Sequence, residues 1–348
     1  MMVRVGIVGA SGYTSSELMR LLVTHPKDLK IELVTSETFA GQRVDHVLPN
    51  LRGFINLDFE KLEIQSLRNR VDVVVLAVPH KVAMEFVPQI RNQGIRVIDF
   101  SADYRLNDQL VYEKWYGIDH TDPDRMPNAV YGLPERYRDQ IRTADLVANP
   151  GCYPTTSILP SIPLISENLV ELDQIIIDAK SGISGAGSKP TDTTHYPNRE
   201  SNLVAYGLVS HRHTPEIEQE LSAINGDEIV VNFTPHLVPM TRGILTTLYF
   251  KLKQSMSTQD LLGIYADFYR NEPFIRVLDL GEYPQTKAVL SSNFCDIGLE
   301  VDPRTNRVIV IAATDNIVKG ASGTVVQNLN LMFGYDETAG LMIPGLMP

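Results

Sequence analysis

The sequence predicts a two-domain α/β protein, with a doubly wound parallel sheet first and an α+β domain with a mainly antiparallel sheet second. Short apolar runs alternate with helical patterns up to about residue 150, which is typical of a parallel sheet covered by helices. Longer segments of alternating polarity follow, and these favour an antiparallel sheet with one covered face. The chain has 348 residues, of which 43% are hydrophobic, so it can fill two cores.

The domain ranges expected from these patterns are 1–150 for the first domain and 151–314 for the second. A last helix is expected to begin near Asp315, and its apolar stripe includes Val318, Val325 and Leu329. We expect this C-terminal segment, 315–348, to return to the first domain.

Composition excludes several classes of protein. Two cysteines supply no disulfide framework and no metal cluster, and no signal-peptide pattern precedes the first apolar run, so we expect a cytoplasmic protein without a metal. No apolar run approaches the length of a membrane span. A net charge of −11 argues against nucleic-acid and anionic-membrane partners, so an anionic substrate must meet a few local arginines and lysines.

The first predicted strand, Val3–Val8, leads into a glycine-rich turn and a helix. Gly9 and Gly12 would let the backbone approach a pyrophosphate at the helix N-terminus, which predicts a Rossmann-type dinucleotide loop rather than a merely tight turn. The expected cofactor contacts in this loop are Gly9, Ser11, Gly12, Tyr13 and Thr14.

The second predicted strand, Ile31–Thr35, ends where an adenosine ribose would lie. Glu37 fits the ribose hydroxyls of NAD, whereas Ser36, Thr38 and Arg43 could bind the 2′-phosphate of NADP. Glu37 could equally be a solvated loop charge, so both readings stay open. Ser36 is an expected cofactor contact in either case.

The apolar run Asp72–Val78 predicts the central strand of the first sheet, and Arg96–Ser101 predicts its neighbour. Pro79 and His80 follow the central strand at its carboxyl end, where open α/β sheets place ligands. Pro79 is therefore an expected cofactor contact, while His80 could be a ligand contact or an ordinary loop histidine.

Cys152 follows a predicted strand, Ala144–Ala148, and the turn Asn149–Gly151. Pro154 suits the first helical turn, so the thiol should lie near a helix N-terminus, where unpaired N–H groups favour thiolate over thiol. The alternative is a small buried apolar residue. The Asn-Pro-Gly turn directly before Cys152 favours a reactive nucleophile over a buried apolar residue.

Beyond Cys152 the pattern predicts long strands, one hairpin and a helix at Thr258–Arg270 with Thr258 as its N-cap. The expected strands are 174–179, 228–233, 243–252, 295–301 and 307–312. Cys295 falls inside one of them, so we expect it to be structural.

Six motifs carry a resemblance to a known family: residues 9–14 (GASGYT), 99–106 (DFSADYRL), 149–155 (NPGCYPT), 181–187 (SGISGAG), 211–217 (HRHTPEI) and 316–321 (NIVKGA). The chain resembles the N-acetyl-γ-glutamyl-phosphate reductases and, more distantly, the aspartate-semialdehyde and glyceraldehyde-phosphate dehydrogenases. Three positions depart from that family's pattern. Ser15 replaces a third glycine, Glu37 replaces an arginine, and Lys189 stands near a missing arginine.

The resemblance implies reversible, NADP(H)-dependent reduction of N-acetyl-L-glutamyl 5-phosphate to the 5-semialdehyde, with phosphate release, in arginine biosynthesis. The implied partners are this small acyl phosphate and inorganic phosphate, and the implied assembly is a homodimer or homotetramer. Cys152 would form a thioester. His211 and His213 are the candidate bases, and on an extended segment they would point to opposite sides, so only one should react. We favour His211, although both could be polar residues on the approach to a helix.

The remaining expected contacts are polar. Arg105 is the candidate for the leaving phosphate, with a surface ion pair to Asp103 or Asp108 as the alternative. Arg242 would bind the substrate carboxylate or the phosphate. Asn316 would bind the nicotinamide carboxamide or cap the last helix. Further expected substrate contacts are Ser184, Asn149 and Lys189, and further cofactor contacts are Ser181, Gly182 and Gly185.

Two other functions fit the sequence less well. A related enzyme could reduce an aminoadipyl phosphate carried on a small acidic protein in lysine biosynthesis, but no long basic run offers a docking surface. A non-catalytic dinucleotide-binding regulator should have lost the cysteine, a histidine or Arg105.

Overall fold

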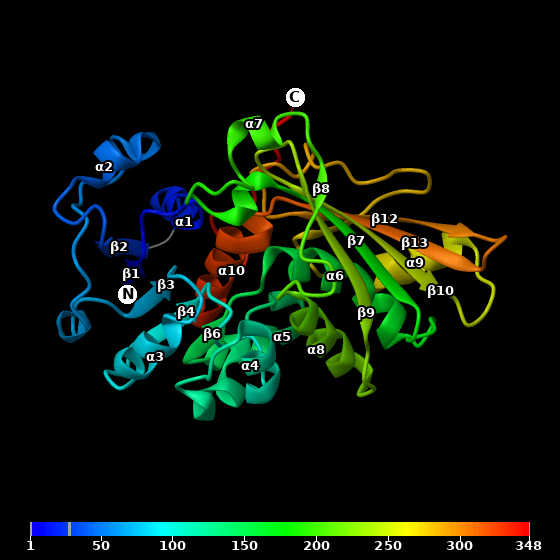
Figure 1. The fold of residues 1–348 in the computed structure, drawn as a ribbon, viewed down its shortest axis with the longest axis horizontal. Helices are drawn as coiled ribbons and strands as arrows, with labels where there is room; N and C mark the ends of the chain where they lie inside the picture. The colour runs from blue at the N-terminus through cyan, green and yellow to red at the C-terminus, as the bar shows by residue number, and fades with distance from the viewer. Residues whose placement is uncertain (1, 27–28, 348) are drawn as a thin grey trace. The chain divides into compact units, whose positions relative to one another are not determined.

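The computed structural model describes residues 2–26 and 29–347, which form two compact units (Figure 1). The first unit runs to Gly151 and takes up Ala321–Met342, and the second comprises Cys152–Gly320 and the segment from Ile343 onward. Met1 and Pro348, which end the expected domain ranges, lie outside the described residues. The return to the first unit therefore begins at Ala321 and stops at Met342.

The first unit is built on a parallel sheet with the strand order β2-β1-β3-β4-β6-β5. Every pair in it is parallel, and the strand order reverses direction at β1, as a doubly wound sheet requires. The strands are β1 (Val3–Val8), β2 (Leu29–Thr35), β3 (Val73–Leu76), β4 (Arg96–Asp99), β5 (Val130–Tyr131) and β6 (Leu146–Ala148). The predicted fold of this half is confirmed.

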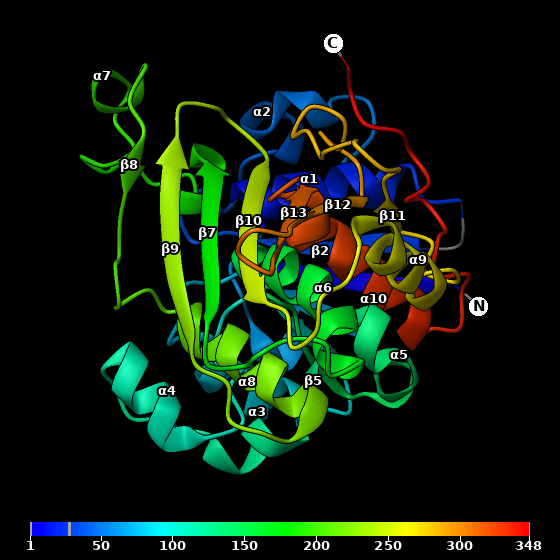
Figure 2. The same cartoon turned by 90° about the vertical axis from the view of Figure 1, so that its right-hand side faces the viewer.

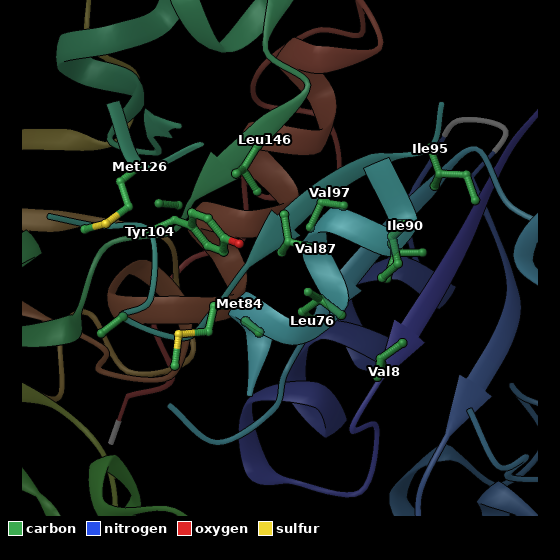
Figure 3. Close-up of a cluster of buried hydrophobic side chains, with 14 of the residues drawn as sticks. Val8, Leu76, Met84, Val87, Ile90, Ile95, Val97, Tyr104, Met126 and Leu146 are labelled. Carbon is green, nitrogen blue, oxygen red and sulfur yellow. The ribbon is translucent and has the colours of Figure 1, made fainter. Parts of the chain in front are cut away.

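Helices cover both faces of this sheet. Val74 and Leu76 of β3 face a core that includes Met84, Val87 and Ile90 of α3 (Figure 3), while Val73 and Val75 point to the other face. The helices of the unit are α1 (Tyr13–Val23), α2 (Val44–Val47), α3 (Ala83–Arg91), α4 (Gln109–Tyr116), α5 (Pro134–Thr143) and α10 (Gly323–Met332), with short 3-10 turns η1 (Pro49–Leu51), η2 (Ile64–Leu67) and η3 (Pro123–Asn128).

The last helix is buried along its whole length, and α1 and α5 pack against it. It begins at Gly323 and not near Asp315 as predicted, because the π-helical turn η5 (Val318–Ser322) comes first. Its polar residues bond to the rest of the unit: Asn328 Nδ2 donates to the carbonyl of Gly132 at 3.0 Å and to Asn149 Oδ1 at 3.3 Å. Polar bonds as well as apolar packing thus hold the returning segment.

The second unit is built on a mixed sheet with the strand order β11-β12-β13-β10-β7-β9-β8 (Figure 2). The β10–β7, β10–β13, β12–β13 and β8–β9 pairs are antiparallel, whereas β7–β9 and β11–β12 are parallel. The strands are β7 (Ile175–Gly182), β8 (Val204–Ala205), β9 (Val231–Val238), β10 (Ile244–Lys251), β11 (Ile275–Val277), β12 (Cys295–Asp302) and β13 (Arg307–Thr314). The predicted, mainly antiparallel sheet is confirmed.

Three helices of the second unit pack on one face of this sheet: α6 (Cys152–Ser166), α8 (Thr214–Asn225) and α9 (Thr258–Phe268). The short η4 (Ile183–Ala186) and α7 (Tyr196–Arg199) lie in the connection from β7 to β8. Thr258 is not the N-cap of α9. Ser257 Oγ accepts from the N–H of Asp260 at 3.1 Å in a capping box, and Thr258 Oγ1 donates to Glu300 at 2.8 Å.

Candidate active site

Cys152 is the first residue of α6, and its side chain is partly exposed. The predicted sequence of strand, turn and helix is present, because β6 ends at Ala148 and α6 begins three residues after Asn149. The backbone N–H groups of the first turn of α6 therefore surround a thiol that solvent can reach. Cys295 is completely buried in β12, as expected of a structural cysteine.

Gly320 makes room for this cysteine within the second unit. A Cβ added at Gly320 would lie 2.8 Å from the Cβ of Cys152 and 3.1 Å from its Cα. Any side chain at position 320 would therefore displace the thiol-bearing residue, so the η5 turn fixes the position of Cys152 by close backbone approach.

An aromatic cluster beside Cys152 contains both histidines. The ring centroids of His211 and His213 are 4.9 Å apart, and they lie 5.5 Å and 6.0 Å from the ring of Tyr153. The prediction that the two side chains point to opposite sides is wrong. His213 has αR backbone angles as the N-cap of α8, so the segment is not extended and both rings reach the same cluster.

The hydrogen bond between the histidines fixes the tautomer of His211. Its Nδ1 accepts from the N–H of His213 at 3.1 Å, so the neutral ring carries its proton on Nε2. Burial, followed by the charge of Arg212, lowers the pKa of His211 to about 4. His211 is therefore a neutral hydrogen-bond donor at physiological pH.

Two tyrosines complete this cluster. Tyr206 donates to the hydroxyl of Tyr153 at 3.3 Å, and Tyr153 donates to the carbonyl of His236 at 2.9 Å. Burial raises the pKa of Tyr206 to about 12; the hydrogen bond with Tyr153 opposes this rise, and the charge of Cys152 adds to it. The pKa of Tyr153 is raised as well, first by burial, then by the neighbouring Tyr206, and then by the charge of Cys152. Both hydroxyls therefore stay protonated beside the thiol.

The glycine loop after β7 is held by Asn316. Asn316 Oδ1 accepts from the N–H of Gly243 at 2.7 Å, and its Nδ2 donates to Ser184 Oγ at 3.0 Å. A Cβ at Gly182 would lie 2.8 Å from the carbonyl oxygen of Thr241, so that glycine is needed for close packing. Asn316 does not cap the last helix, since α10 begins at Gly323.

Arg242 lies against a buried carboxylate. Its Nε is 3.0 Å from Oδ2 of Asp315, which is fully buried and also accepts from the N–H groups of Ser291 and Ile317 at 2.7 and 2.8 Å. This pair holds the start of the η5 turn. Lys189, by contrast, is an exposed residue of the β7–β8 connection.

In the first unit, the loop after β1 has the geometry of a phosphate cradle. Gly9 has φ +80°, and a Cβ there would lie 2.3 Å from the carbonyl oxygen of Ala77. Gly12 is the N-cap of α1, with open space where a side chain would be. Ser15 is fully buried and donates to the carbonyl of Gly9 at 2.9 Å, so a serine preserves the close packing that a third glycine would give.

The end of β2 faces this loop through Ser36, whose Oγ lies 3.1 Å from Ser11 Oγ. Glu37 and Thr38 are exposed. Arg43 donates from Nε and Nη2 to Asp45 at 2.9 Å each, so its guanidinium is already engaged. Pro79 is exposed beyond β3, and His80 Nδ1 accepts from the N–H of Ala102 at 3.0 Å.

Arg105 is not a surface residue, which rules out an ordinary surface ion pair. It is only 5% exposed, and it donates from Nε to the carbonyl of Asn149 at 2.8 Å and from Nη2 to that of Phe100 at 2.7 Å. Asn149 is fully buried, and its Nδ2 donates to the carbonyls of Pro150 and Ala321. These bonds hold the turn that leads into Cys152.

Comparison with known proteins decides the family. Proteins named N-acetyl-gamma-glutamyl-phosphate reductase from Desulforudis audaxviator (strain MP104C), Symbiobacterium thermophilum and Methanosarcina mazei are each 50% identical to this chain. These alignments cover 99% to 100% of this chain and 99% to 100% of each relative.

The chain belongs to the N-acetyl-gamma-glutamyl-phosphate reductase family.

The domain composition agrees with this reductase family. Residues 4–144 match the family described as semialdehyde dehydrogenase, NAD binding domain, and residues 152–316 match semialdehyde dehydrogenase, dimerisation domain. The second match means that a dimerisation domain is present in the reductase half that carries Cys152.

Solved structures share the fold of the reductase family. Aspartate semialdehyde dehydrogenase II from Vibrio cholerae matches with a TM-score of 0.74 and 16% identity, over 96% of this chain and 99% of that one. A probable aspartate-semialdehyde dehydrogenase from Pseudomonas aeruginosa matches with a TM-score of 0.70 and 20% identity over the same shares. At these identities the likeness concerns the fold alone.

The described residues contain neither a cluster suited to a metal ion nor a helix suited to crossing a membrane. No cluster of three or more histidine, cysteine or carboxylate side chains in that part of the chain is arranged to hold a metal ion. Within residues 2–26 and 29–347, no helix combines the length and the apolar character that crossing a bilayer requires.

Sequence reasoning about this reductase missed several residues that shape the site. Tyr206 and Tyr153 were not predicted, although Tyr153 follows the cysteine directly and its ring contacts both histidines. Asp315 and Gly320 flank the predicted Asn316 without having been recognised, and Asn328 bonds the predicted Asn149. A buried charge and a close glycine leave no periodic signal in a single sequence.

Proposed function

We propose that this chain catalyses the reversible, NADPH-dependent reduction of N-acetyl-L-glutamyl 5-phosphate to N-acetyl-L-glutamate 5-semialdehyde, with release of inorganic phosphate, in arginine biosynthesis. The observation that carries the proposal is the partly exposed thiol of Cys152 at the first position of α6, beside the cluster of His211 and His213. Relatives that align over the full chain carry the name of this activity.

The proposed reaction proceeds through a thioester on Cys152, and its steps follow in order. The thiolate of Cys152 attacks the acyl carbon, the C–O bond to phosphate breaks, and phosphate leaves a thioester. Addition of hydride to the thioester carbon gives a thiohemiacetal oxyanion, which takes up a proton. Collapse then returns the hydroxyl proton to the base, forms the C=O bond, breaks the C–S bond, regenerates the thiolate and releases the aldehyde.

The two histidines take different roles in this proposal. Neutral His211, with its proton on Nε2, donates a hydrogen bond to the developing oxyanion, as a neutral imidazole can when its pKa is low. Proton exchange then falls to His213, whose ring lies in the same cluster. This assignment reverses the preference that we drew from the sequence.

Several polar groups would bind the anionic substrate. Arg105, which donates from Nε to the carbonyl of Asn149 and from Nη2 to that of Phe100, would supply positive charge for the leaving phosphate. Arg242 and Lys189 supply positive charge for the substrate carboxylate. Ser184, held by Asn316, and Asn149 would fix the polar groups of the substrate.

NADP(H) would supply the hydride. The cradle formed by Gly9, Ser11, Gly12, Tyr13 and Thr14 at the start of α1 fits a pyrophosphate, since Gly9 admits no side chain and the space at Gly12 is open. Ser36 would bind the adenosine end, and exposure of Glu37 removes the reason to favour NAD. Further contacts would come from Pro79, Ser181, Gly182, Gly185 and Asn316.

The proposed enzyme is a cytoplasmic homodimer or homotetramer that binds neither nucleic acid nor membrane. The sheet face opposite α6 carries a row of partly exposed apolar side chains, Ile176, Tyr249 and Ile309, in register across β7, β10 and β13. Such a face suits a second copy of the chain. The net charge of −11 disfavours polyanionic partners.

The deciding experiment is a phosphate-dependent NADP reduction assay with N-acetylglutamate semialdehyde. Wild-type protein should reduce NADP only when phosphate or arsenate is present, and Cys152→Ser should lose at least 10³-fold in turnover because a hydroxyl is a far weaker nucleophile at neutral pH. Cys295→Ser is the matched control and should keep normal turnover. Activity in Cys152→Ser would refute the thioester route.

A further inference from the structure

The connection between β7 and α8 contains one buried residue, and that residue is a cation. From Ile183 to His213 every residue is exposed or partly exposed except Arg199, which is only 7% exposed. Figure 2 shows α7 and β8 of this connection lying beyond β9, and β8 is the edge strand of the sheet. A buried arginine in an otherwise solvated segment is unusual, because burying a charge is unfavourable unless a partner compensates for it.

The described residues give this guanidinium no such compensation. Arg199 Nε and Nη1 are buried without a hydrogen-bond partner. The nearby amides are turned to main-chain oxygens, since Asn198 Nδ2 donates to the carbonyl of Asp192 at 2.7 Å and Asn202 Nδ2 to that of Asn198 at 2.9 Å. Glu200 accepts from the hydroxyl of Ser201. The missing acceptor must come from outside the segment.

Arg199 lines an open hollow with room for such an acceptor. The hollow has a volume of about 480 Å³, and its lining consists of Asp192, Thr193, Pro197, Asn198, Arg199 and Asn202. None of these residues belongs to the proposed Cys152 site. The hollow therefore combines a buried cation with an exposed carboxylate, that of Asp192.

We propose that this hollow is a binding site for hydrogen phosphate, anchored by Arg199. A planar guanidinium can offer two parallel N–H groups to two oxygens of an anion, which suits phosphate. Hydrogen phosphate also carries an O–H group that can donate to Asp192, whereas sulfate at neutral pH carries none. One ligand thus satisfies both charged groups of the hollow. The site requires neither the thiol nor the cofactor loop, so it goes beyond the proposed function.

The test counts phosphate bound per chain. Equilibrium dialysis with radiolabelled inorganic phosphate, at constant ionic strength, is carried out on the full-length wild type, on Arg199→Met and on Arg270→Met. Arg270 is the matched control because its side chain is 70% exposed and pairs with Asp267 on α9. We expect Arg199→Met to lose the phosphate site in the hollow and to keep the phosphate site used in turnover at Cys152. Arg270→Met should bind as much phosphate as the wild type.

Asp192→Asn tests the selectivity. The wild-type site should prefer phosphate to sulfate at least tenfold, and Asp192→Asn should lose that preference, since an amide can donate to either anion. If sulfate competes equally in the wild type, Asp192 plays no part and the hydrogen-phosphate assignment fails. If Arg199→Met binds as much phosphate as the wild type, the site itself is refuted.

Thermal unfolding provides a readout that a merely structural arginine would not give. In phosphate-free buffer Arg199→Met should melt no lower than the wild type, and only the wild type should gain the phosphate-dependent rise from this site. A large drop in phosphate-free buffer would show that the folded chain already satisfies the guanidinium, which overturns the proposal. So would dissociation of an oligomer in Arg199→Met with phosphate binding unchanged. The turnover assay judges the proposed function independently.

Discussion

Hydrogen bonding makes His211 chemically different from the histidine two residues along the chain. Its Nδ1 is occupied by the N–H of His213, and burial keeps its pKa near 4, so the ring stays neutral with its proton on Nε2. A neutral donor needs no change of protonation during turnover. A local backbone bend thus gives different hydrogen-bond partners to two histidines that the sequence presents as equivalents.

Replacement of His211 should change how the stability of the protein depends on pH. The folded pKa of about 4 lies below the unfolded value of 6.5, so the unfolded chain binds a proton first and stability falls as pH drops from 6.5 toward 4. His211→Gln removes this titration. Between pH 7 and 4.5 the wild type should lose about 1–2 kcal/mol more unfolding free energy than His211→Gln, as urea titrations would measure.

A turnover control accompanies that comparison. Gln offers an amide N–H close to the position of Nε2, whereas Leu offers none, so His211→Gln should keep at least ten times the turnover of His211→Leu. Equal loss in both variants would show that donation from Nε2 is not the role of this residue.

Replacement of Glu37 tests the cofactor preference. The residue is exposed and follows Ser36 at the end of β2. Glu37→Arg should therefore strengthen NADP binding only by about 0–1 kcal/mol, the range of an exposed pair. Dissociation constants for NADP and NAD, measured for both proteins, check this. A wild type that favours NAD by about tenfold, or 1.4 kcal/mol, would contradict the NADP assignment.

Among the elements, the η5 turn contributes most to the position of Cys152. It lies between β13 and α10, its start is held by the ion pair of Arg242 and Asp315, and Gly320 lies against Cys152. The π-helical geometry brings backbone close to the thiol-bearing residue, which a regular helix starting near Asp315 would not do. The π-helical turn, an irregularity of the helix, is therefore in direct contact with Cys152 of the candidate site.

A methyl group at position 320 should test that coupling. Gly320→Ala would place Cβ 2.8 Å from that of Cys152, so we expect a destabilisation of about 1–3 kcal/mol and at least a tenfold loss of turnover. Thermal unfolding measures the loss of stability, and the NADP assay measures the loss of turnover. Gly263→Ala is the control: it lies in α9 with open space around it, so the protein should gain about 0.5–1 kcal/mol. Normal turnover in Gly320→Ala would show that the contact is unimportant.

Elements with strong periodicity could be predicted from the sequence, and those set by tertiary contacts could not. Strands buried on both faces, such as β1, β3 and β4, appear in the sequence as continuous apolar runs. Strands buried on one face, such as β10 and β13, appear as alternating apolar and polar residues. Both patterns could therefore be recognised from the sequence. The two-residue strands β5 and β8 leave no such pattern. The N-cap of α9 is Ser257 and not the predicted Thr258, because Ser257 and Asp260 form a capping box.

The same distinction applies to the site. Cys152 and the glycine loop follow from local chemistry at strand ends, so the sequence alone placed them at helix starts. The shared orientation of His211 and His213 depends on one αR residue, and the burial of Arg105 depends on the distant carbonyl of Asn149. Such non-local contacts have no counterpart in residue spacing.

On the scale of the whole molecule, one buried carboxyl group should make global stability depend on pH. Asp99 is fully buried and accepts from the N–H and hydroxyl of Ser101 at 2.8 and 2.7 Å. Burial, and then the charge of Asp103, raises its pKa to about 7. The folded chain therefore keeps a proton that the unfolded chain releases above 3.8, and this contribution to stability is lost as pH rises through 7.

Asp99→Asn should abolish this dependence, because the amide is nearly isosteric and never ionises. The two proteins should be closest in stability at pH 5, and at pH 8.5 the variant should be more stable by about 1–3 kcal/mol in urea titrations. Asp139→Asn, with a side chain 92% exposed in the wild type, is the control and should show no such trend. A wild type that gains stability over Asp99→Asn with rising pH would contradict the assignment.

The return of Ala321–Met342 to the first unit has a consequence for biosynthesis. The sheet of that unit is translated before the second unit, whereas α10, which is buried along its whole length, is translated after Cys152–Gly320. We therefore expect the first unit to finish folding only after the second unit has been translated, although the usual order is N-terminal first. Proteolysis of ribosome-bound chains stalled before Ala321 has left the ribosome should cut the first 151 residues readily, and it should spare them once α10 has emerged.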